Sequence, residues 1–337
     1  MHERPATERP ANHRPAIERH VIVPRDHPDL PTEHGDFNVQ GPSVILTPEW
    51  LAEAGSESLG RYLLYFAHHW GASIRLATAD HPTGPWRVVS TDVLHVDDVG
   101  RAMDPTDQRR HVASPDVHVD DETRTLWMYF HGHLTEAAAG HLPSWGRYPT
   151  MDQHTLVATS HDGLRFHPTD DDRAISPSYH RAFRWHGHWY GLSMPSGLCR
   201  SVDGLSDFEV GPSLFDDDEV RHSGLLVQGH ELLVWFTRAR SAPEQILRTT
   251  VDLRGDWMSW QPTPPVEVLR PTESWEGAGL PVEPTPRGPS FEPQHGLRDP
   301  FVLDISAEDD PDAVGRWLFY AAAGEFSLGV TRLDGAT

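Results

Sequence analysis

The chain has 337 residues and a net charge of −22, from 50 acidic and 28 basic side chains. All the basic side chains are arginine, a composition that fits either a salt-adapted surface or a G+C-rich genome. A strongly anionic surface repels phosphate backbones and anionic lipid. The composition therefore argues against nucleic acid and membranes as partners.

Three further features indicate the compartment. No apolar run approaches the roughly 18 residues that a membrane-spanning helix needs. The N-terminus lacks the cationic and then apolar segments of a secretory signal. The one cysteine, Cys199, cannot form an internal disulfide, which fits a reducing environment. We expect a soluble, cytoplasmic protein.

The first 36 residues differ from the rest. Residues 1–36 are rich in Pro, Arg, Glu and His and hold little apolar material that could pack. Most of this segment is expected to be an extended or disordered arm. Residues 20–23 read His-Val-Ile-Val and are the exception, with the pattern of a strand. We assign residues 37–337 to a single domain.

A pattern of three strands recurs five times in that domain. Each unit holds a short apolar strand, a second strand rich in aromatic side chains, and a third that often reads Leu-x-Ala-Thr or similar. The strands are expected at residues 41–46, 62–66 and 74–79 in unit one, 114–119, 126–130 and 155–160 in unit two, 180–185, 189–192 and 197–201 in unit three, 223–227, 232–236 and 246–251 in unit four, and 299–303, 317–320 and 327–331 in unit five.

These five copies predict an all-β fold, a five-bladed β-propeller with three- to four-stranded antiparallel blades. A β-sandwich is the alternative, but sandwiches seldom show such self-similarity. The fifth unit lacks an outer strand. Residues 20–23 would supply one and close the ring, which removes exposed sheet edges.

In a propeller the innermost strands line a central channel, so their first residues meet at one mouth. Here these positions bring together carboxylates, imidazoles, an amide and a guanidinium. Burying such groups unpaired is costly, so they must pair, bind a metal or face a wet pocket. The residues concerned are Gln40, Asp116, Tyr179, His180, His222, Ser223, Arg298 and Asp299.

Several segments resemble five-bladed glycoside hydrolases, chiefly family 43 and its relatives in families 32, 68 and 117. Residues 79–86 resemble the segment that closes a first blade, and residues 160–163 resemble the usual Ser-x-Asp-Gly turn. Asp116, in Ser-Pro-Asp-Val, resembles the family Asp that orients the catalytic acid. Asp299, in Arg-Asp-Pro, resembles the triplet of families 32 and 68, although there it falls in a different blade. The resemblance covers residues 38–333 and implies an enzyme that acts on carbohydrate.

Two family carboxylates are missing where the resemblance places them. Gly41 stands where family 43 has its general base, and residues 178–187 hold no carboxylate where the general acid belongs. Glycoside hydrolysis normally requires two carboxyl groups beside the scissile bond. We therefore expect Asp299 as base, Asp116 as the residue that tunes the acid, and Glu276 or a histidine as the acid. An ion pair with a channel arginine is an equal expectation for Asp116, and a solvated loop position is favoured for Glu276.

The 23 histidines suggest a second possibility. Imidazoles that converge on the channel suit a divalent metal, either calcium or a transition metal, and we assign His222 and His295 to it. No local spacing supports this site, and hydrolysis by carboxylates needs no cofactor. The side chains expected to bind substrate lie at or beside the mouth: Gln40, His68, His69, Trp70, His180 and Arg298.

The leading interpretation is a glycoside hydrolase-like enzyme that acts on a small glycan or a glycosylated metabolite at the axial pocket. Two alternatives stay open. One is a metal-dependent lyase or another non-hydrolytic enzyme that uses the histidines. The other is a sugar-binding propeller without catalysis, which the missing carboxylates suggest.

Overall fold

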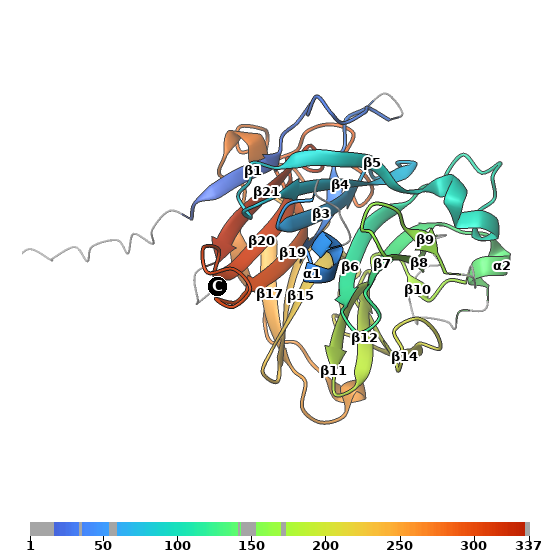
Figure 1. Ribbon diagram of the computed structural model, residues 1–337. Coiled ribbons are helices and arrows are strands. Elements are labelled where there is room, and N and C mark those ends of the chain that lie inside the picture. The colour runs from blue at the N-terminus through green and yellow to red at the C-terminus, as the bar shows by residue number, and fades with distance from the viewer. Residues whose placement is uncertain are drawn as a thin grey trace, which may run out of the picture.

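The computed structural model describes residues 17–33, 36–53, 59–140, 142, 153–169 and 173–333. Within these residues the strands form five antiparallel sheets, arranged as the blades of a β-propeller (Figure 1). The predicted fold class is confirmed. None of the helices in the described ranges could span a lipid bilayer.

Each predicted unit forms one blade, and its three predicted strands are present. Blade 1 consists of β2 (Gln40–Leu46), β3 (Tyr62–Ala67), β4 (Ser73–Ala79) and β5 (Arg87–His95). Blade 2 consists of β6 (Ala113–Asp120), β7 (Thr125–His133) and β8 (Gln153–Ser160), and the short strands β9 (His167–Pro168) and β10 (Ser176–Pro177) both pair with β8.

Blades 3 to 5 follow in chain order. Blade 3 consists of β11 (Arg181–Trp185), β12 (His188–Ser193), β13 (Gly197–Ser201) and β14 (Glu209–Ser213). Blade 4 consists of β15 (Val220–Gln228), β16 (Glu231–Arg238), β17 (Ile246–Asp252) and β18 (Val266–Leu269). Blade 5 consists of β19 (Leu297–Ile305), β20 (Gly315–Ala322) and β21 (Ser327–Leu333). The short helices of the described chain are α1 (Glu49–Glu53) and α2 (Glu136–Ala139). The 3₁₀ segments are η1 (Val96–Ala102), which is kinked at Gly100, η2 (Trp257–Ser259) and η3 (Ser274–Glu276).

The ring is closed by the beginning of the chain. Strand β1 (Arg19–Val23) pairs antiparallel with β21, so that Arg19 faces Thr331 and His20 faces Val330. Figure 1 shows the blue β1 beside the red end of the chain. The outer strand of blade 5 therefore comes from the segment that precedes blade 1, and residues 1–16 lie outside the described residues.

Hydrophobic cores lie between neighbouring blades rather than within them. Four of these clusters are extensive, as between blades 1 and 2, where Leu76 and Phe130 belong to one core. The cluster between blades 2 and 3 is small and holds Tyr129, Val157, Ile175 and Ala182. Between blades 2 and 3, polar contacts near the axis therefore add to the small hydrophobic cluster.

The inner strands share a distortion where they enter the channel. In β2, β6, β15 and β19 the pairing register shifts within the first few residues. Ser114 and Asp299 there have φ of 48° and 51°, and Tyr179, just before β11, has φ of 59°. A non-glycine residue in this region costs of the order of 1–3 kcal/mol, so surrounding contacts must hold it. Bulges of this kind re-aim side chains next to active sites.

Candidate functional site

Asp299 and His222 form a buried pair at the mouth of the channel. Oδ2 of Asp299 accepts a hydrogen bond from the Gly41 amide at 3.1 Å, and Oδ1 pairs with Nδ1 of His222. Burial, together with the nearby Arg221 cation, holds the pKa of His222 well below its ordinary value of 6.5. The imidazole is therefore neutral at physiological pH. The carboxylate favours the tautomer with its proton on Nδ1, which leaves the lone pair on Nε2.

Tyr179 and further imidazoles stack beside this pair. The ring of Tyr179 lies 3.5 Å from that of His222 and 4.2 Å from that of His131, centroid to centroid. Burial lowers the pKa of His111, the next ring in the row, to about 4, and lowers that of His131 well below 6.5. Both ring nitrogens of His131, Nε2 of His111 and Nε2 of Gln40 are buried without partners in the described part of the chain. Such groups indicate bound water or ligand at this position.

Two arginines and two glutamates form a buried network next to the stack. Nε of Arg298 lies 3.0 Å from Glu244, and NH1 lies 3.0 Å from Glu325. Nε of Arg221 lies 3.2 Å from the other oxygen of Glu244. Burial alone would raise the pKa of Glu325, but His69, at 3.2 Å, and Arg298 hold it well below its usual range. The charges in this network are matched to one another.

The same arginines also form hydrogen bonds to the connection between blades 4 and 5, residues 270–296. Arg221 donates to the carbonyl of Pro286, and Arg298 donates to the carbonyl of Gly288 at 3.4 Å. Since both arginines stand at the mouth, the connection covers the blade 4 and blade 5 side of it.

An exposed aromatic pair stands at the rim. Trp70, in the turn between β3 and β4, and Phe291, in the connection between blades 4 and 5, meet edge to face with centroids 5.4 Å apart. They are 43% and 50% exposed. Trp70 also lies beside His69, with ring centroids 6.4 Å apart, so the pair is continuous with the buried network. Exposed rings next to a cluster of polar side chains suit stacking against a sugar face.

Arg181 lies across the axis below the mouth. Its guanidinium donates to the carbonyls of Pro42, Pro115 and Ser223, which belong to blades 1, 2 and 4. It also lies over the ring of Phe301 of blade 5, 5.5 Å from the centroid. One side chain of blade 3 thus contacts the inner strands of the other four blades.

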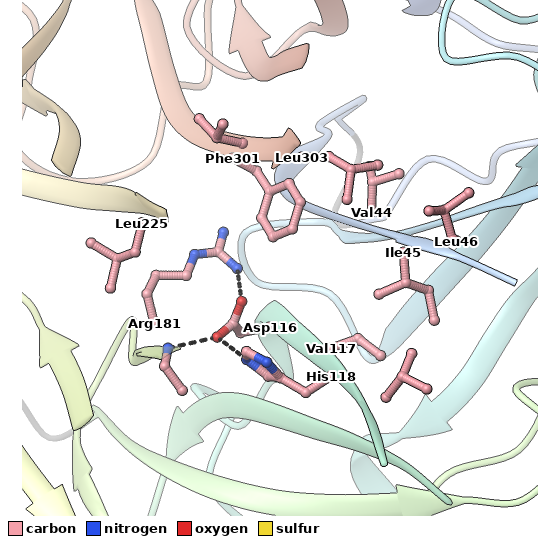
Figure 2. Close-up of a pocket in the computed structure, with 13 residues that line it drawn as sticks. Val44, Ile45, Leu46, Asp116, Val117, His118, Arg181, Leu225, Phe301 and Leu303 are labelled. Atoms are coloured by element: carbon pink, nitrogen blue, oxygen red, sulfur yellow. Dashed lines mark hydrogen bonds and ion pairs between the residues drawn. The ribbon is translucent and has the colours of Figure 1, made fainter. Parts of the chain in front are cut away.

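Asp116 is the counter-ion of this guanidinium (Figure 2). Its Oδ1 lies 3.2 Å from NH1 of Arg181, and its Oδ2 accepts from the Ala182 amide and from Nε2 of His118, both at 2.8 Å. Burial alone would raise the pKa of Asp116, but His118, Arg181 and the amide lower it to about 2. The ion pair expected for Asp116 is present, and its carboxylate oxygens are engaged by the protein itself.

No protein-family model matches the chain. The uncharacterized protein R118 of Acanthamoeba polyphaga mimivirus is 32% identical over 327 residues, which cover 90% of this chain and 85% of the viral protein. This chain belongs to the same family as that viral protein.

Several solved structures have the same architecture. A thermostable family-43 glycoside hydrolase superposes with a TM-score of 0.58 at 12% identity, over 89% of this chain and 91% of the enzyme. A GH43_1 enzyme from Xanthomonas citri gives 0.57 at 12% identity, over 94% and 92%. An endo-arabinase from Bacteroides thetaiotaomicron VPI-5482 gives 0.52 at 10% identity, over 93% and 97%. The family of R118 thus has the five-bladed propeller fold of family-43 glycoside hydrolases.

Most sequence-predicted site residues lie at the mouth, with differing degrees of access. Asp299, His222, His69 and Arg298 belong to the clusters above, and Trp70 lies at the rim. Gln40 is buried, and its Oε1 accepts from the Ser114 hydroxyl at 2.8 Å. His68 and His180 are also buried; Nδ1 of His180 contacts the Ser176 hydroxyl at 2.9 Å, and its ring packs against Tyr129.

Glu276 does not join the other predicted catalytic residues. It is fully buried at the outer side of blade 5, where it accepts hydrogen bonds from Arg19 of β1 at 2.6 Å and from the Tyr320 hydroxyl of β20 at 2.7 Å. The amides of Thr272 and Glu273 also donate to it. Both carboxylate oxygens are engaged, so neither the general-acid role nor the solvated loop position describes this residue.

The described residues do not fit the expected metal. No group of three or more His, Cys, Asp or Glu side chains among them is arranged to hold an ion. His222 pairs with Asp299, whereas His295 lies apart and its Nδ1 contacts the Leu280 carbonyl at 3.1 Å. The cation near the axis is instead the guanidinium of Arg181.

Sequence reasoning did not single out Arg181, Glu244, Glu325 or Phe291. Only Arg181 carried a signal, because it directly follows the predicted mouth residue His180 in an inner strand. The two glutamates lie outside the inner strands, after β16 and in the turn between β20 and β21. Their place at the mouth follows from the path of the chain and from no local motif.

Proposed function

We propose that this protein is a carbohydrate-active enzyme whose reaction takes place at the mouth of the propeller channel. The proposal rests on buried polar atoms around the Asp299–His222 pair that have no hydrogen-bond partner in the described part of the chain. They include Nε2 of Gln40 and both ring nitrogens of His131. Sugar hydroxyls both donate and accept hydrogen bonds and would satisfy such atoms. The exposed rings of Trp70 and Phe291 supply the apolar surface that a sugar ring also needs.

The proton chemistry would centre on His222. Asp299 holds Nδ1, which leaves the Nε2 lone pair of a neutral imidazole to accept a proton from water or from a sugar hydroxyl. Burial and the nearby Glu325 raise the pKa of Tyr179 above its ordinary value, so this phenol stays protonated. Because Tyr179 stacks on His222, it would be the proton donor to the leaving group. Asp299 would then act as the positioning residue for the base.

The substrate would be a small, uncharged glycan or glycosylated metabolite. Arg221 and Arg298 are paired with Glu244 and Glu325, so neither guanidinium is free to bind an anionic sugar. The covered side of the mouth favours the end of a chain over its middle.

A second candidate is non-hydrolytic cleavage. The carboxylates Asp116, Glu244 and Glu325 all face arginines, so the two free carboxyl groups of ordinary glycoside hydrolysis are not available among the described residues. A histidine base and a tyrosine donor are sufficient for an elimination, in which a proton leaves carbon and the glycosidic oxygen departs with a proton.

The test is a screen of uncharged glycosides and oligosaccharides in water labelled with oxygen-18. Wild type, Asp299→Asn and His222→Gln are compared. Hydrolysis places the heavy oxygen in the reducing product, whereas elimination gives an unsaturated product without it. The matched control is Asp304→Asn, an exposed position on the same strand as Asp299. We expect activity to fall by about 100-fold or more in both mouth variants and to persist in the control. Activity unchanged by both substitutions would place the reaction elsewhere.

A further inference from the structure

A cavity lies on the other side of Arg181 from the mouth residues. It has a volume of about 310 Å³ and is lined by residues from all five inner strands (Figure 2). Its walls come from later positions of these strands than the mouth residues, for example Val44 after Gln40 and Phe301 after Asp299. Arg181 bonds to three of the inner strands between the mouth residues and the cavity.

The lining is apolar on every side but one. Ten of its thirteen residues are aliphatic or aromatic: Val44, Ile45, Leu46, Val117, Val119, Ala182, Leu225, Phe301, Val302 and Leu303. The other three are Asp116, His118 and Arg181, which Figure 2 shows grouped at one wall. A mostly apolar cavity with a few polar groups at one point is the usual form of a small-molecule site, and its volume lies at the lower end of the usual ~300–1,000 Å³.

The polar wall has one donor to spare. A guanidinium has five N–H groups. Those of Arg181 have four acceptors among the described residues, namely the carbonyls of Pro42, Pro115 and Ser223 and the carboxylate of Asp116. One N–H on NH2 therefore has no acceptor in the described chain, although Arg181 is only 4% exposed. Asp116 already receives three donors, from Arg181 on Oδ1 and from Ala182 and His118 on Oδ2.

The charge at this wall is already balanced. Arg181 and Asp116 form a matched pair, so a charged ligand would be buried without a counter-ion, at high cost. The ligand must therefore be uncharged. Its size is bounded by the volume, which is about twice the ~150 Å³ that accommodates benzene in an engineered protein cavity.

We propose that this cavity binds an uncharged, apolar molecule of one substituted ring that carries one hydrogen-bond acceptor, such as a carbonyl oxygen. The oxygen accepts the spare N–H of Arg181. The ring lies among Leu225, Phe301 and Val44. This site is independent of the carbohydrate chemistry at the mouth.

The test uses three fluorinated probes of similar shape and fluorine NMR of the full-length protein. Para-fluoroacetophenone has the ring and the acceptor, para-fluoroethylbenzene lacks the acceptor, and para-fluorobenzoate adds a negative charge. We expect saturable binding of the ketone, binding of the hydrocarbon about fivefold weaker for want of one hydrogen bond, and no binding of the benzoate. Absence of saturable ketone binding overturns the proposal, and so does tighter binding of the benzoate.

Two variants locate the site. Leu225→Trp fills the cavity from β15, and Val119→Phe fills it from the partly exposed end of β6, where a larger ring is tolerated if the first variant does not fold. Val202→Trp adds a tryptophan at a position that is 77% exposed and serves as control. We expect at least about tenfold weaker ketone binding in each folded cavity variant and unchanged binding in the control. Unchanged binding in a folded cavity variant overturns the assignment, whatever the outcome of the glycan screen.

Discussion

Arg181 and Asp116 face each other at the propeller axis, with NH1 3.2 Å from Oδ1 and both side chains buried. The pair joins blade 3 to blade 2, where the hydrophobic core between blades is small. Because the guanidinium also reaches carbonyls of blades 1 and 4, the ion pair and its hydrogen bonds hold the inner strands in their relative positions.

Asp116→Asn is expected to destabilise the fold strongly. The substitution leaves the Arg181 cation buried without a counter-ion, and loss of one partner of a buried pair typically costs about 3–5 kcal/mol. The loss is measured as the difference in free energy of unfolding between wild type and variant, obtained from urea titration. Asp92→Asn, at an exposed position, serves as control and is expected to stay within about 0.5 kcal/mol of wild type. Equal stability of the two variants would show that Asp116 does not compensate Arg181.

The Asp116–Arg181 pair also makes the free energy of unfolding depend on pH in acidic solution. The folded-state pKa of Asp116 is about 2, below its ordinary 3.8, so the unfolded chain binds this proton more readily. The contribution is present above the unfolded pKa and is lost as the pH falls through about 4 towards 2, and it amounts to roughly 2 kcal/mol. The difference in unfolding free energy between wild type and Asp116→Asn should therefore shrink in this window. A difference independent of pH would contradict the pairing.

Glu276→Gln is expected to reduce stability and leave activity intact. The amide leaves Arg19, whose side chain is mostly buried, without its counter-ion and weakens the bond from Tyr320. We expect a loss of about 3 kcal/mol in unfolding free energy, with kcat of any identified glycan reaction unchanged. Glu283→Gln, at an exposed position of the same connection, is the matched control. A large fall in kcat with normal stability would restore Glu276 as the acid.

Gly191→Ala is expected to disturb blade 3 through His180. A methyl group at position 191 would lie 1.9 Å from Cε1 of the His180 ring, which is itself buried. Overpacking of this kind costs about 1–3 kcal/mol. Thermal unfolding measures it, with Gly279→Ala as control because nothing lies within 4 Å there. The double variant with His180→Ala should recover part of the loss; no recovery would mean that another contact is responsible.

The pH profile of kcat/KM tests His222 as the base. Its pKa lies well below 6.5 because of burial and the nearby Arg221, so the neutral, active form persists into mildly acidic solution. Activity should stay level through neutrality and fall only at a pH well below the ordinary histidine value. The profile of Asp304→Asn should coincide with wild type. An acid limb centred near 6.5 would show that another group controls the reaction.

The repeat of strands, their order and the closing strand near the N-terminus could all be predicted from the sequence. Short runs of apolar and aromatic residues mark the strands, and turn residues mark their ends, so these features are local. The mouth could be predicted in outline for the same reason. Gln40, Asp116, His222 and Asp299 each stand at the start of an inner strand, and propeller geometry brings such positions together.

What each side chain does at the mouth was decided by the tertiary structure alone. The Gly41 amide donates to Asp299 across 258 positions of sequence, and Arg181 donates to the Pro42 carbonyl across 139. Glu276, which the sequence placed in a loop beside the site, is bound to Arg19 of the closing strand 257 positions away. Pairing of charges depends on distance and burial in the closed ring, and neither quantity is encoded in the local pattern that defines the strands.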